Sequence, residues 1–298
     1  MTRFVLGTGG AFGLLSQKQI NNLIDNAFSI GINSFDSGSN YAYGKAEILL
    51  GNALKKFKRE EIYISTKAGT VYDSLRKFHK DFSIQNIENS FNRSLKNLDV
   101  DYLDTFYLHG PSLNEIDNDL INFLQNLKAN KKIINWGINS HDDDVLKGII
   151  ELDNKPDIVM LDYNVGLSER RELVEKIAKN GIKVSAGTIL AQGRLIKRLP
   201  WFPCRKKELF YLLRALLKKT SRDAALKSSN IRRKLKQNYG EFYKSIPIPA
   251  ISSDNNVSEI VVGTTNINLL VNNYALSLLT FNKKYLDQIF EITSSGNL

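Results

Sequence analysis

Short apolar runs alternate along the chain with longer stretches in which apolar residues recur every three or four positions. Such runs are typical of buried β-strands, and the longer stretches of amphipathic helices. Strands are predicted over residues 4–8, 32–35, 61–66, 101–108, 133–138, 157–161, 182–186 and 259–262. Helices are predicted between Ser16 and Gly31 and over 46–57, 83–98, 116–130, 142–152, 168–180, 267–278 and 283–294. Eight strand–helix units with short connections favour an α/β fold, a (β/α)8 TIM barrel.

Two helix starts carry a specific signal. Ser16 is predicted to cap the first helix, and Gln19 stands where the partner of a capping box belongs. Ser83 is predicted to cap the helix that follows it.

The strand–helix alternation breaks between Gly187 and Asp254, after the seventh strand. This segment holds most of the prolines and a run of basic residues from Arg194 to Lys234, and it predicts an extended loop followed by irregular helices. Long loops after barrel strands often cover a ligand. The basic residues are interpreted either as solvated faces of surface helices or as groups that face a pyrophosphate or a phosphorylated substrate. A final helix closes the chain.

Composition narrows the class of protein. A 298-residue chain with 42% hydrophobic residues can bury a large core, and we expect residues 1–298 to form a single domain. The net charge of +10 suits anionic ligands, but no motif for nucleic-acid binding is present, and no nucleic-acid partner is expected. With Cys204 as the single cysteine, no secretion signal, no membrane-spanning run and no metal-binding cluster, we expect a soluble, cytoplasmic protein without a metal.

Four side chains with complementary chemistry follow three consecutive predicted strands. Asp36 follows the second strand, Lys67 the third and His109 the fourth, and Tyr41 lies on the loop after the second. The carboxyl ends of barrel strands open on one face, where active sites lie. Tyr43 competes with Tyr41 for the phenol position, and spacing alone does not choose between them.

This set suits proton transfer to a carbonyl oxygen. A phenol is a poor acid at neutral pH, and a neighbouring ammonium lowers its pKa by favouring the phenolate. Asp36 can hold the Lys67 ammonium in place, so that the tyrosine donates and recovers a proton. A histidine beside it can donate a hydrogen bond to the same oxygen. No side chain delivers a hydride, so a nicotinamide cofactor is implied.

Three segments resemble the aldo-keto reductase family. Residues 35–51 (FDSGSNYAYGKAEILLG) are similar to its F-D-T-A-x-x-Y-G segment with the downstream E-x-x-L-G, and residues 64–69 (ISTKAG) to its strand with the catalytic lysine. Residues 101–109 (DYLDTFYLH) resemble the strand that ends at its histidine. The resemblance implies a barrel with Asp36, Tyr41, Lys67 and His109 as the catalytic tetrad, and its register selects Tyr41 over Tyr43.

The resemblance also implies a cofactor site, without a Rossmann fingerprint, along the strand ends. Its expected residues are Gly7, Thr8, Asp36, Asn139, Ser140, Gly187, Thr188, Leu190, Gly193, Gly263, Thr264, Thr265 and Asn273. The family's carboxamide-binding glutamine falls at Met160, which cannot donate a hydrogen bond, and its stacking tyrosine falls at Gly187. Gly263 and Leu269 stand where NADP-selective members carry basic residues. Family habit favours NADP, whereas these two residues favour NAD.

Two functions remain open. The first is an NAD(P)-dependent oxidoreductase that interconverts an alcohol and a carbonyl compound, which is an aldehyde, a ketone or a sugar. The second is a nicotinamide-binding sensor or partner subunit with little turnover, which the incomplete carboxamide site suggests and the complete tetrad opposes.

Overall fold

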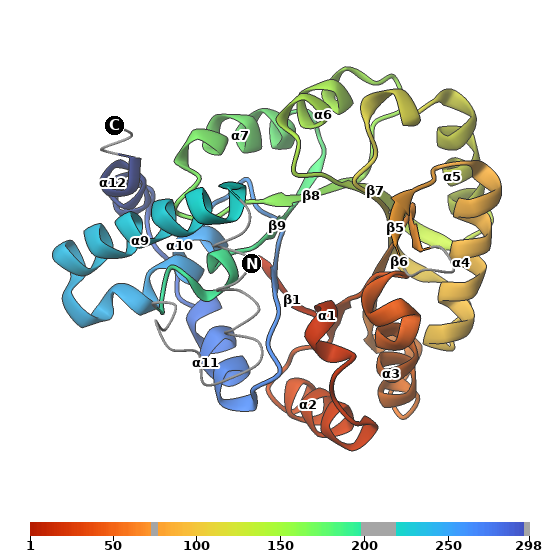
Figure 1. The fold of residues 1–298 in the computed structure, drawn as a ribbon, viewed down its shortest axis with the longest axis horizontal. Helices are drawn as coiled ribbons and strands as arrows, with labels where there is room; N and C mark the ends of the chain where they lie inside the picture. The colour runs from red at the N-terminus through yellow and green to blue at the C-terminus, as the bar shows by residue number, and fades with distance from the viewer. Residues whose placement is uncertain (73–76, 198–218, 295–298) are drawn as a thin grey trace.

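The barrel predicted from the sequence is present. A computed structural model describes residues 1–72, 77–197 and 219–294 of the chain. Eight parallel strands close into a ring with the helices outside it (Figure 1). They are β1 (Arg3–Gly7), β2 (Ser34–Asp36), β3 (Tyr63–Ala68), β6 (Leu103–His109), β7 (Ile133–Asn139), β8 (Ile158–Asp162), β9 (Lys183–Gly187) and β10 (Glu259–Val262).

The ring follows the chain order, β1, β2, β3, β6, β7, β8, β9, β10, and then returns to β1. The closing seam pairs Arg3 with Glu259 and Leu6 with Val262. Because every strand is parallel to its neighbours, all carboxyl ends lie on the same face of the barrel.

Helices cover the outside of the ring, and their starts follow the predicted chemistry. They are α1 (Gly9–Phe12), α2 (Gln17–Ser29), α3 (Lys45–Leu54), α4 (Ile84–Leu98), α5 (Asn118–Ala129), α6 (Asp143–Gly148), α7 (Arg171–Lys179), α9 (Lys219–Tyr239), α10 (Pro247–Ser252), α11 (Ile267–Ser277) and α12 (Lys283–Ser294). The capping box of Ser16 and Gln19 is formed at α2, and Ser83 caps α4. These caps satisfy backbone N–H groups that have no partner inside the helix.

Two small elements were not predicted. The short helix α1 follows β1 almost directly. An antiparallel hairpin of β4 (Thr70–Tyr72) and β5 (Phe78–Lys80) follows β3. The hairpin contacts the loop after β2 through Tyr43, whose ring lies edge-on to Tyr72 and stacks on Phe78.

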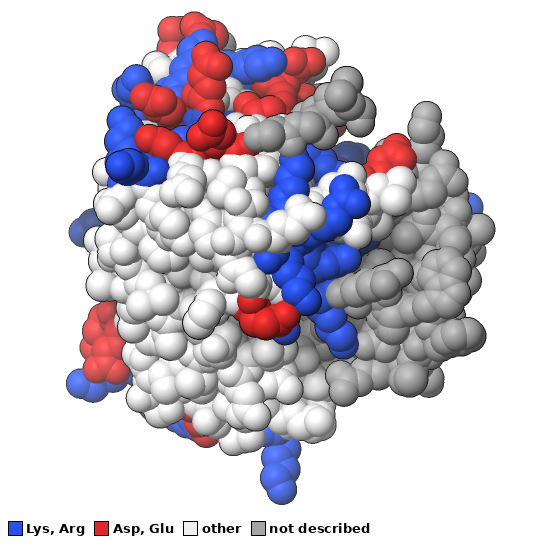
Figure 2. All heavy atoms as spheres, turned by 90° about the vertical axis from the view of Figure 1, so that its left-hand side faces the viewer, with Lys and Arg blue, Asp and Glu red and all other residues white. Residues whose placement is uncertain are grey.

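The segment after β9 contains helices, as predicted. Its residues 198–218, which include Cys204 and several of the basic residues, lie outside the described residues. Figure 2 shows Lys and Arg side chains gathered on the side of the molecule where α9 lies. Lys227 pairs with Glu169, and the Arg232 guanidinium donates to the carbonyl oxygen of Arg194 at 2.8 Å. These contacts join α9 to the barrel and to the loop after β9.

Most apolar side chains form one core between the ring and the helices. A smaller cluster of Tyr107, Ile158 and Met160 packs separately, with Val261 against it. Tyr107 is fully buried although it carries a hydroxyl group. A buried phenol needs a hydrogen-bond partner.

Candidate active site

The four predicted side chains come together at adjacent strand ends. Asp36 is the last residue of β2, Lys67 lies one residue before the end of β3, and His109 is the last residue of β6. These strands are neighbours in the ring, and Tyr41 lies on the loop just after β2. The position of each residue at the end of a strand therefore gathers the tetrad on one side of the barrel mouth.

Asp36 and Lys67 form a buried ion pair. The Lys67 ammonium donates to Oδ2 of Asp36 and, at 2.8 Å, to the carbonyl oxygen of Ser37. The Ser65 hydroxyl donates to Oδ1 of Asp36 at 2.9 Å. Lys67 is only 1% exposed, so burial disfavours its charge, but Asp36 and Tyr41 outweigh burial and raise the pKa of the ammonium. Lys67 is therefore charged at neutral pH.

Tyr41 lies against this ion pair. Its ring centroid is 5.1 Å from the Lys67 ammonium and 6.1 Å from the His109 ring, to which it is edge-on. A Cβ atom on Gly38 would come within 3.1 Å of the Tyr41 ring, so glycine at that position leaves room for the ring. Two groups of the expected tetrad, Lys67 and His109, thus lie beside the Tyr41 ring.

Tyr43 points elsewhere. Ala42 and Tyr43 both adopt left-handed backbone conformations, with φ of 50° and 58°, which are uncommon for residues other than glycine. This turn separates the two tyrosines, and Tyr43 stacks on Phe78 of the hairpin with 43% of its surface exposed. The geometry therefore supports Tyr41 as the phenol of the tetrad. Strained backbone of this kind occurs often at functional sites.

His109 is held neutral. Burial lowers its pKa from 6.5 to about 3, with further lowering by the positive charges of Lys67 and Lys80 and by His141. Its Nδ1 atom is buried, and no hydrogen-bond partner for it lies in the described part of the chain. A neutral imidazole has one N–H donor and one acceptor nitrogen. His109 can therefore donate a hydrogen bond to a substrate oxygen without carrying a charge.

The cofactor residues expected after β7 are buried beside the tetrad. The Asn139 side chain donates to the carbonyl oxygen of Met160 at 3.1 Å, which leaves its own amide oxygen for a ligand. The Ser140 hydroxyl accepts from the backbone of Asp142. The backbone N–H of Gly110, the residue after His109, donates to the carbonyl oxygen of Asn139 at 2.7 Å. An amide and a hydroxyl thus stand next to the histidine.

Met160 and Gly187 differ from the family pattern in the structure as in the sequence. The Met160 side chain is 5% exposed and packs with Tyr107 and Ile158, so it presents no donor. A Cβ atom on Gly187 would meet only the carbonyl oxygen of Leu161, at 3.4 Å, which is ordinary contact. The position of Gly187 therefore has room for a side chain, and the chain supplies none.

The turn after β9 has an unusual backbone. Positive φ angles occur at Thr188, Ala191, Gln192 and Gly193, three of which are not glycine. The turn contains the expected cofactor residues Thr188, Leu190 and Gly193, and the next residue, Arg194, brings a nearly buried cation. Strain of this kind persists only where the surroundings fix it, and a cation beside it suits a phosphate group.

Asp162 anchors this turn and was not predicted. Its carboxylate accepts from the Thr188 hydroxyl at 2.8 Å and lies 2.9 Å from Nδ1 of His141. Burial opposes the charge of Asp162, but His141, Thr188 and Arg170 outweigh it and lower the pKa of the carboxyl group. The position of Asp162 at the end of the sixth predicted strand was the signal that could have found it.

The remaining cofactor residues lie around β1 and β10. Gly7 pairs with Asp36, and the Thr8 hydroxyl donates to Ser37, so both adjoin the tetrad. A Cβ atom on Gly263 would lie 3.3 Å from the carbonyl oxygen of Gly7, which places the two loops against each other. Thr264 and Thr265 follow, and Asn273 is buried on α11.

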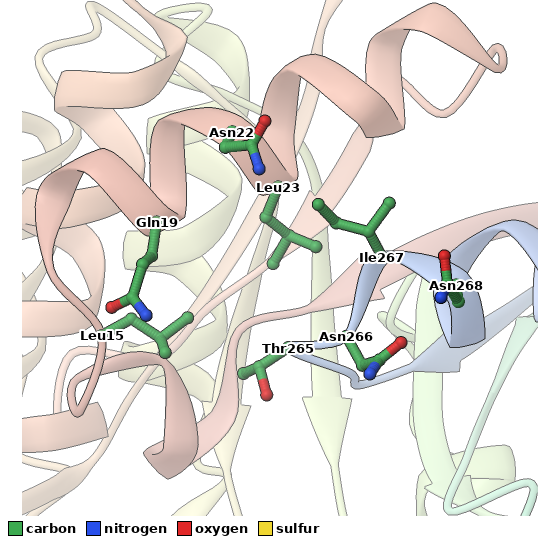
Figure 3. Close-up of a pocket in the computed structure, with 8 residues that line it drawn as sticks. All are labelled: Leu15, Gln19, Asn22, Leu23, Thr265, Asn266, Ile267 and Asn268. Atoms are coloured by element: carbon green, nitrogen blue, oxygen red, sulfur yellow. The ribbon is translucent and has the colours of Figure 1, made fainter.

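A cavity of about 410 Å³ opens between α2 and the start of α11 (Figure 3). Its lining residues are Leu15, Gln19, Asn22, Leu23, Thr265, Asn266, Ile267 and Asn268. Among the expected site residues it contains Thr265 alone, and no member of the tetrad. The chemistry of the side chains, rather than the cavity, therefore locates the site.

These residues fit a nicotinamide dinucleotide in kind. The amide oxygen of Asn139, which accepts from none of the described residues, and the Ser140 hydroxyl suit a carboxamide, and the strained turn with Arg194 suits a pyrophosphate. Gly187, which has no side chain, and the apolar Met160 side chain add no hydrogen-bonding group to that set. Among the described residues, no group of three His, Cys, Asp or Glu side chains could hold a metal ion, and no helix is long and apolar enough to cross a membrane.

Comparison with known proteins agrees with the geometry. The model of the aldo/keto reductase family matches residues 3–293. The L-glyceraldehyde 3-phosphate reductase of Escherichia coli (strain K12) is 28% identical, over 97% of this chain and 87% of its own. The NADH-specific methylglyoxal reductase of Escherichia coli (strain K12) is 29% identical, over 64% of this chain and 63% of its own. An aldo/keto reductase from Klebsiella pneumoniae in complex with NADP and acetate superposes with a TM-score of 0.71 at 19% identity, covering 99% of this chain and 92% of its own.

Proposed function

The chain belongs to the aldo/keto reductase family, and from that premise we propose that it interconverts a small carbonyl compound and an alcohol with Tyr41 as general acid and base. Membership of the family makes it an NAD(P)H-dependent oxidoreductase. We propose NADP as the cofactor, with NAD as the alternative. The match over residues 3–293 supports a single domain.

One observation carries the assignment of Tyr41: its ring lies beside a buried, charged lysine. The Lys67 ammonium, held by Asp36, stabilises the negative charge that the phenol oxygen gains when it gives its proton to the substrate. In the reverse direction the same oxygen takes the proton from the alcohol. Tyr41 therefore serves both directions without leaving its position.

His109 orients the substrate. Because its pKa is far below neutral, it remains an uncharged donor and can hydrogen-bond the carbonyl oxygen beside Tyr41. Two donors on one oxygen polarise the carbonyl group and fix its direction. A histidinium would instead add a second positive charge next to Lys67.

The cofactor lies along the remaining strand ends in this proposal. Asn139 and Ser140 would hold the carboxamide, the Thr188–Gly193 turn the pyrophosphate, and the loop from Gly263 to Thr265 the adenosine end, with Asn273 on α11. Bound there, a reduced nicotinamide supplies the hydride that no side chain provides.

The substrate is proposed to be a small, polar aldehyde, ketone or sugar. Two relatives are named for reduction of L-glyceraldehyde 3-phosphate and of methylglyoxal, both small and polar.

Turnover with a panel of carbonyl compounds tests this function. Purified protein is mixed with NADPH or NADH and each aldehyde, ketone or sugar, and the loss of nicotinamide absorbance is followed. Tyr41→Phe is expected to lower kcat by about 10³-fold, because general acid–base catalysis contributes about 10²–10⁴-fold. The matched control Tyr43→Phe removes the same atom two residues away and is expected to keep most of the activity. Full activity in Tyr41→Phe would refute the assignment.

Met160 and Gly187 favour a second function, in which the chain binds the cofactor with little turnover. A chain with a complete tetrad and a sparse carboxamide site could bind the cofactor as a sensor or partner subunit. Tight binding of NADPH without turnover of any carbonyl compound would favour that function. Measurable turnover that depends on Tyr41 would exclude it.

A further inference from the structure

A polar chain runs from the tetrad to the opposite end of the barrel. Tyr107 lies directly beside Lys67, since the two residues are register partners on β6 and β3. The centroid of the Tyr107 ring is 6.0 Å from the Lys67 ammonium, and the ring is fully buried. The side chain therefore forms part of the surroundings of the ammonium on the side away from the barrel mouth.

Glu259 accepts a hydrogen bond from the hydroxyl group of Tyr107. Oε1 of Glu259 accepts from the Tyr107 hydroxyl at 3.3 Å, and Oε2 accepts from Arg3 at 3.3 Å. Glu259 is the first residue of β10, so it lies at the amino end of the barrel, and it is 1% exposed. A carboxylate so deeply buried is costly unless it has a role or full compensation.

The residues packed around Tyr107 hold its ring in one position. Gly137 is its register partner on β7, and a Cβ atom there would come within 2.7 Å of two ring carbons. Ile158 and Met160 pack against the ring. The residue in the family's glutamine position thus contacts the tyrosine that adjoins Lys67.

The polar, charged and titratable groups that face Glu259 come from five strands. Arg3 and Tyr107 touch it, Tyr63 and Asp36 act on it at longer range, and Ser185 adjoins it from β9. Burial raises the pKa of Glu259, and Asp36 adds to that effect, whereas Ser185, Arg3 and Tyr107 oppose it. Burial also raises the pKa of Tyr107, so the phenol stays protonated and donates.

We infer that Glu259 is a positioning residue for the tetrad. By accepting a hydrogen bond from Tyr107, it fixes the position of the Tyr107 ring. That ring lies beside the Lys67 ammonium and so keeps the ammonium against Asp36 and Tyr41. The inference rests on the proposed roles of Lys67 and Tyr41. Glu259 acts through Tyr107 and touches neither substrate nor cofactor.

The test compares three variants and one matched control by their pH profiles. Tyr107→Phe and Glu259→Leu remove the hydrogen bond, and Glu259→Gln keeps an acceptor and removes the charge. Tyr63→Phe removes a different, partly buried hydroxyl, which bonds Thr105. We expect the first two to lower kcat by about 10–100-fold with little change in KM, because displacing a catalytic group by about 1 Å costs on the order of 10²-fold.

The alkaline side of the profile reports the position of Lys67. The rate of carbonyl reduction falls at high pH as the tetrad loses its proton, and a displaced ammonium favours that loss less. In Tyr107→Phe and Glu259→Leu the half-point is therefore expected to move up by at least about 0.5 pH unit. Glu259→Gln and Tyr63→Phe are expected to keep the wild-type half-point and most of the rate.

Two results would overturn the inference. If Tyr107→Phe and Glu259→Leu lose thermal stability but keep the wild-type half-point, Glu259 is merely structural. If Glu259→Gln moves the half-point as far as Glu259→Leu, its charge acts and its hydrogen bond does not. Tyr107→Phe carries the test alone if Glu259→Leu does not fold.

A measurement independent of turnover separates this inference from the proposed function. The NMR signal of the Lys67 ammonium, assigned by its absence in Lys67→Met, is expected to shift in Tyr107→Phe and to stay in place in Tyr63→Phe. A wild-type protein without turnover would remove the proposed function while this comparison still stood. An unmoved signal in Tyr107→Phe would remove the inference alone.

Discussion

The two halves of the barrel mouth differ in the polar and charged side chains that they contribute to the site. In the first half, around the ends of β2, β3 and β6, Lys67 and Asp36 form an ion pair, and the Ser65 hydroxyl donates a hydrogen bond to Oδ1 of Asp36. Around the ends of β7 to β10, Gly187 carries no side chain, and Met160 packs in the apolar cluster with Tyr107 and Ile158. The first half supplies the groups proposed to transfer the proton, and the second half contains the residues proposed to hold the cofactor that supplies the hydride.

This contrast separates two kinds of effect. Changes in the first half should alter the rate of the chemical step and the stability of the fold, because they leave buried charges without partners. Changes in the second half should alter cofactor affinity and little else, since Gly187 and Leu269 carry no charge whose removal would leave a buried partner unpaired.

Lys67→Met should remove the buried ion pair in the first half of the barrel mouth. The buried Asp36 carboxylate would lose its ammonium, and removing one partner of a buried pair costs about 3–5 kcal/mol of unfolding free energy. We expect kcat to fall by about 10²-fold or more as well. Urea unfolding and steady-state kinetics measure the two losses. The double variant Asp36→Asn/Lys67→Met should regain most of the stability and none of the activity; recovery of activity would contradict the division.

The pH dependence of stability should report His109. The folded protein keeps this imidazole neutral down to about pH 3, whereas the unfolded chain protonates it near 6.5. Between these values the unfolded state binds more protons, so stability rises with pH across the window. At pH 4 the wild type should have lost about 3 kcal/mol that His109→Gln retains, at about 1.4 kcal/mol per pH unit. Equal losses in both proteins, measured by urea unfolding at pH 4 and 7, would disprove the assignment.

Gly187→Tyr should strengthen the second half. The site has room for a Cβ atom, and an added ring can stack on the nicotinamide, which is worth about 0.5–1.5 kcal/mol. The dissociation constant for NADPH, measured by fluorescence quenching, should fall by roughly threefold to tenfold. Gly187→Ala serves as the matched control and should leave it unchanged. Weaker binding in Gly187→Tyr would show that the space is needed for another group.

Leu269→Arg should produce the smallest effect and bear on the choice of cofactor. Leu269 is half exposed on α11, where a guanidinium could reach a 2′-phosphate that NAD lacks. We expect the ratio of NADPH to NADH efficiency to rise by about fivefold. Leu269→Gln, of similar size without charge, should not change the ratio. A ratio that rises equally in both would mean that charge is not the cause.

Most of the fold was readable because parallel strands buried on both faces appear as short apolar runs. The eight runs, with the caps at Ser16 and Ser83, fixed the barrel order before any contact was known. The β4–β5 hairpin was missed because strands of three residues are too short to show a period. Its stability comes from rings it shares with Tyr43, which no local pattern reveals.

The sequence predicts those site residues that lie at the ends of strands. Position brought Asp36, Lys67 and His109 together, and Ser65 could have been added, since it shares the face of Lys67 two residues earlier. Spacing could not choose between Tyr41 and Tyr43, because a left-handed residue between them turns them apart. The structure supports Tyr41, and turnover of the two variants decides the role.

The bond between Tyr107 and Glu259 joins residues 152 positions apart, so it exists only after the barrel has closed. The seam that forms it is the last to become available during synthesis, because β10 leaves the ribosome long after β1. Asp36, Tyr41, Lys67 and His109 all lie in the first 109 residues of the chain and must wait for that strand. A nascent or truncated chain would thus carry every group of the tetrad and still lack the contact that completes its surroundings.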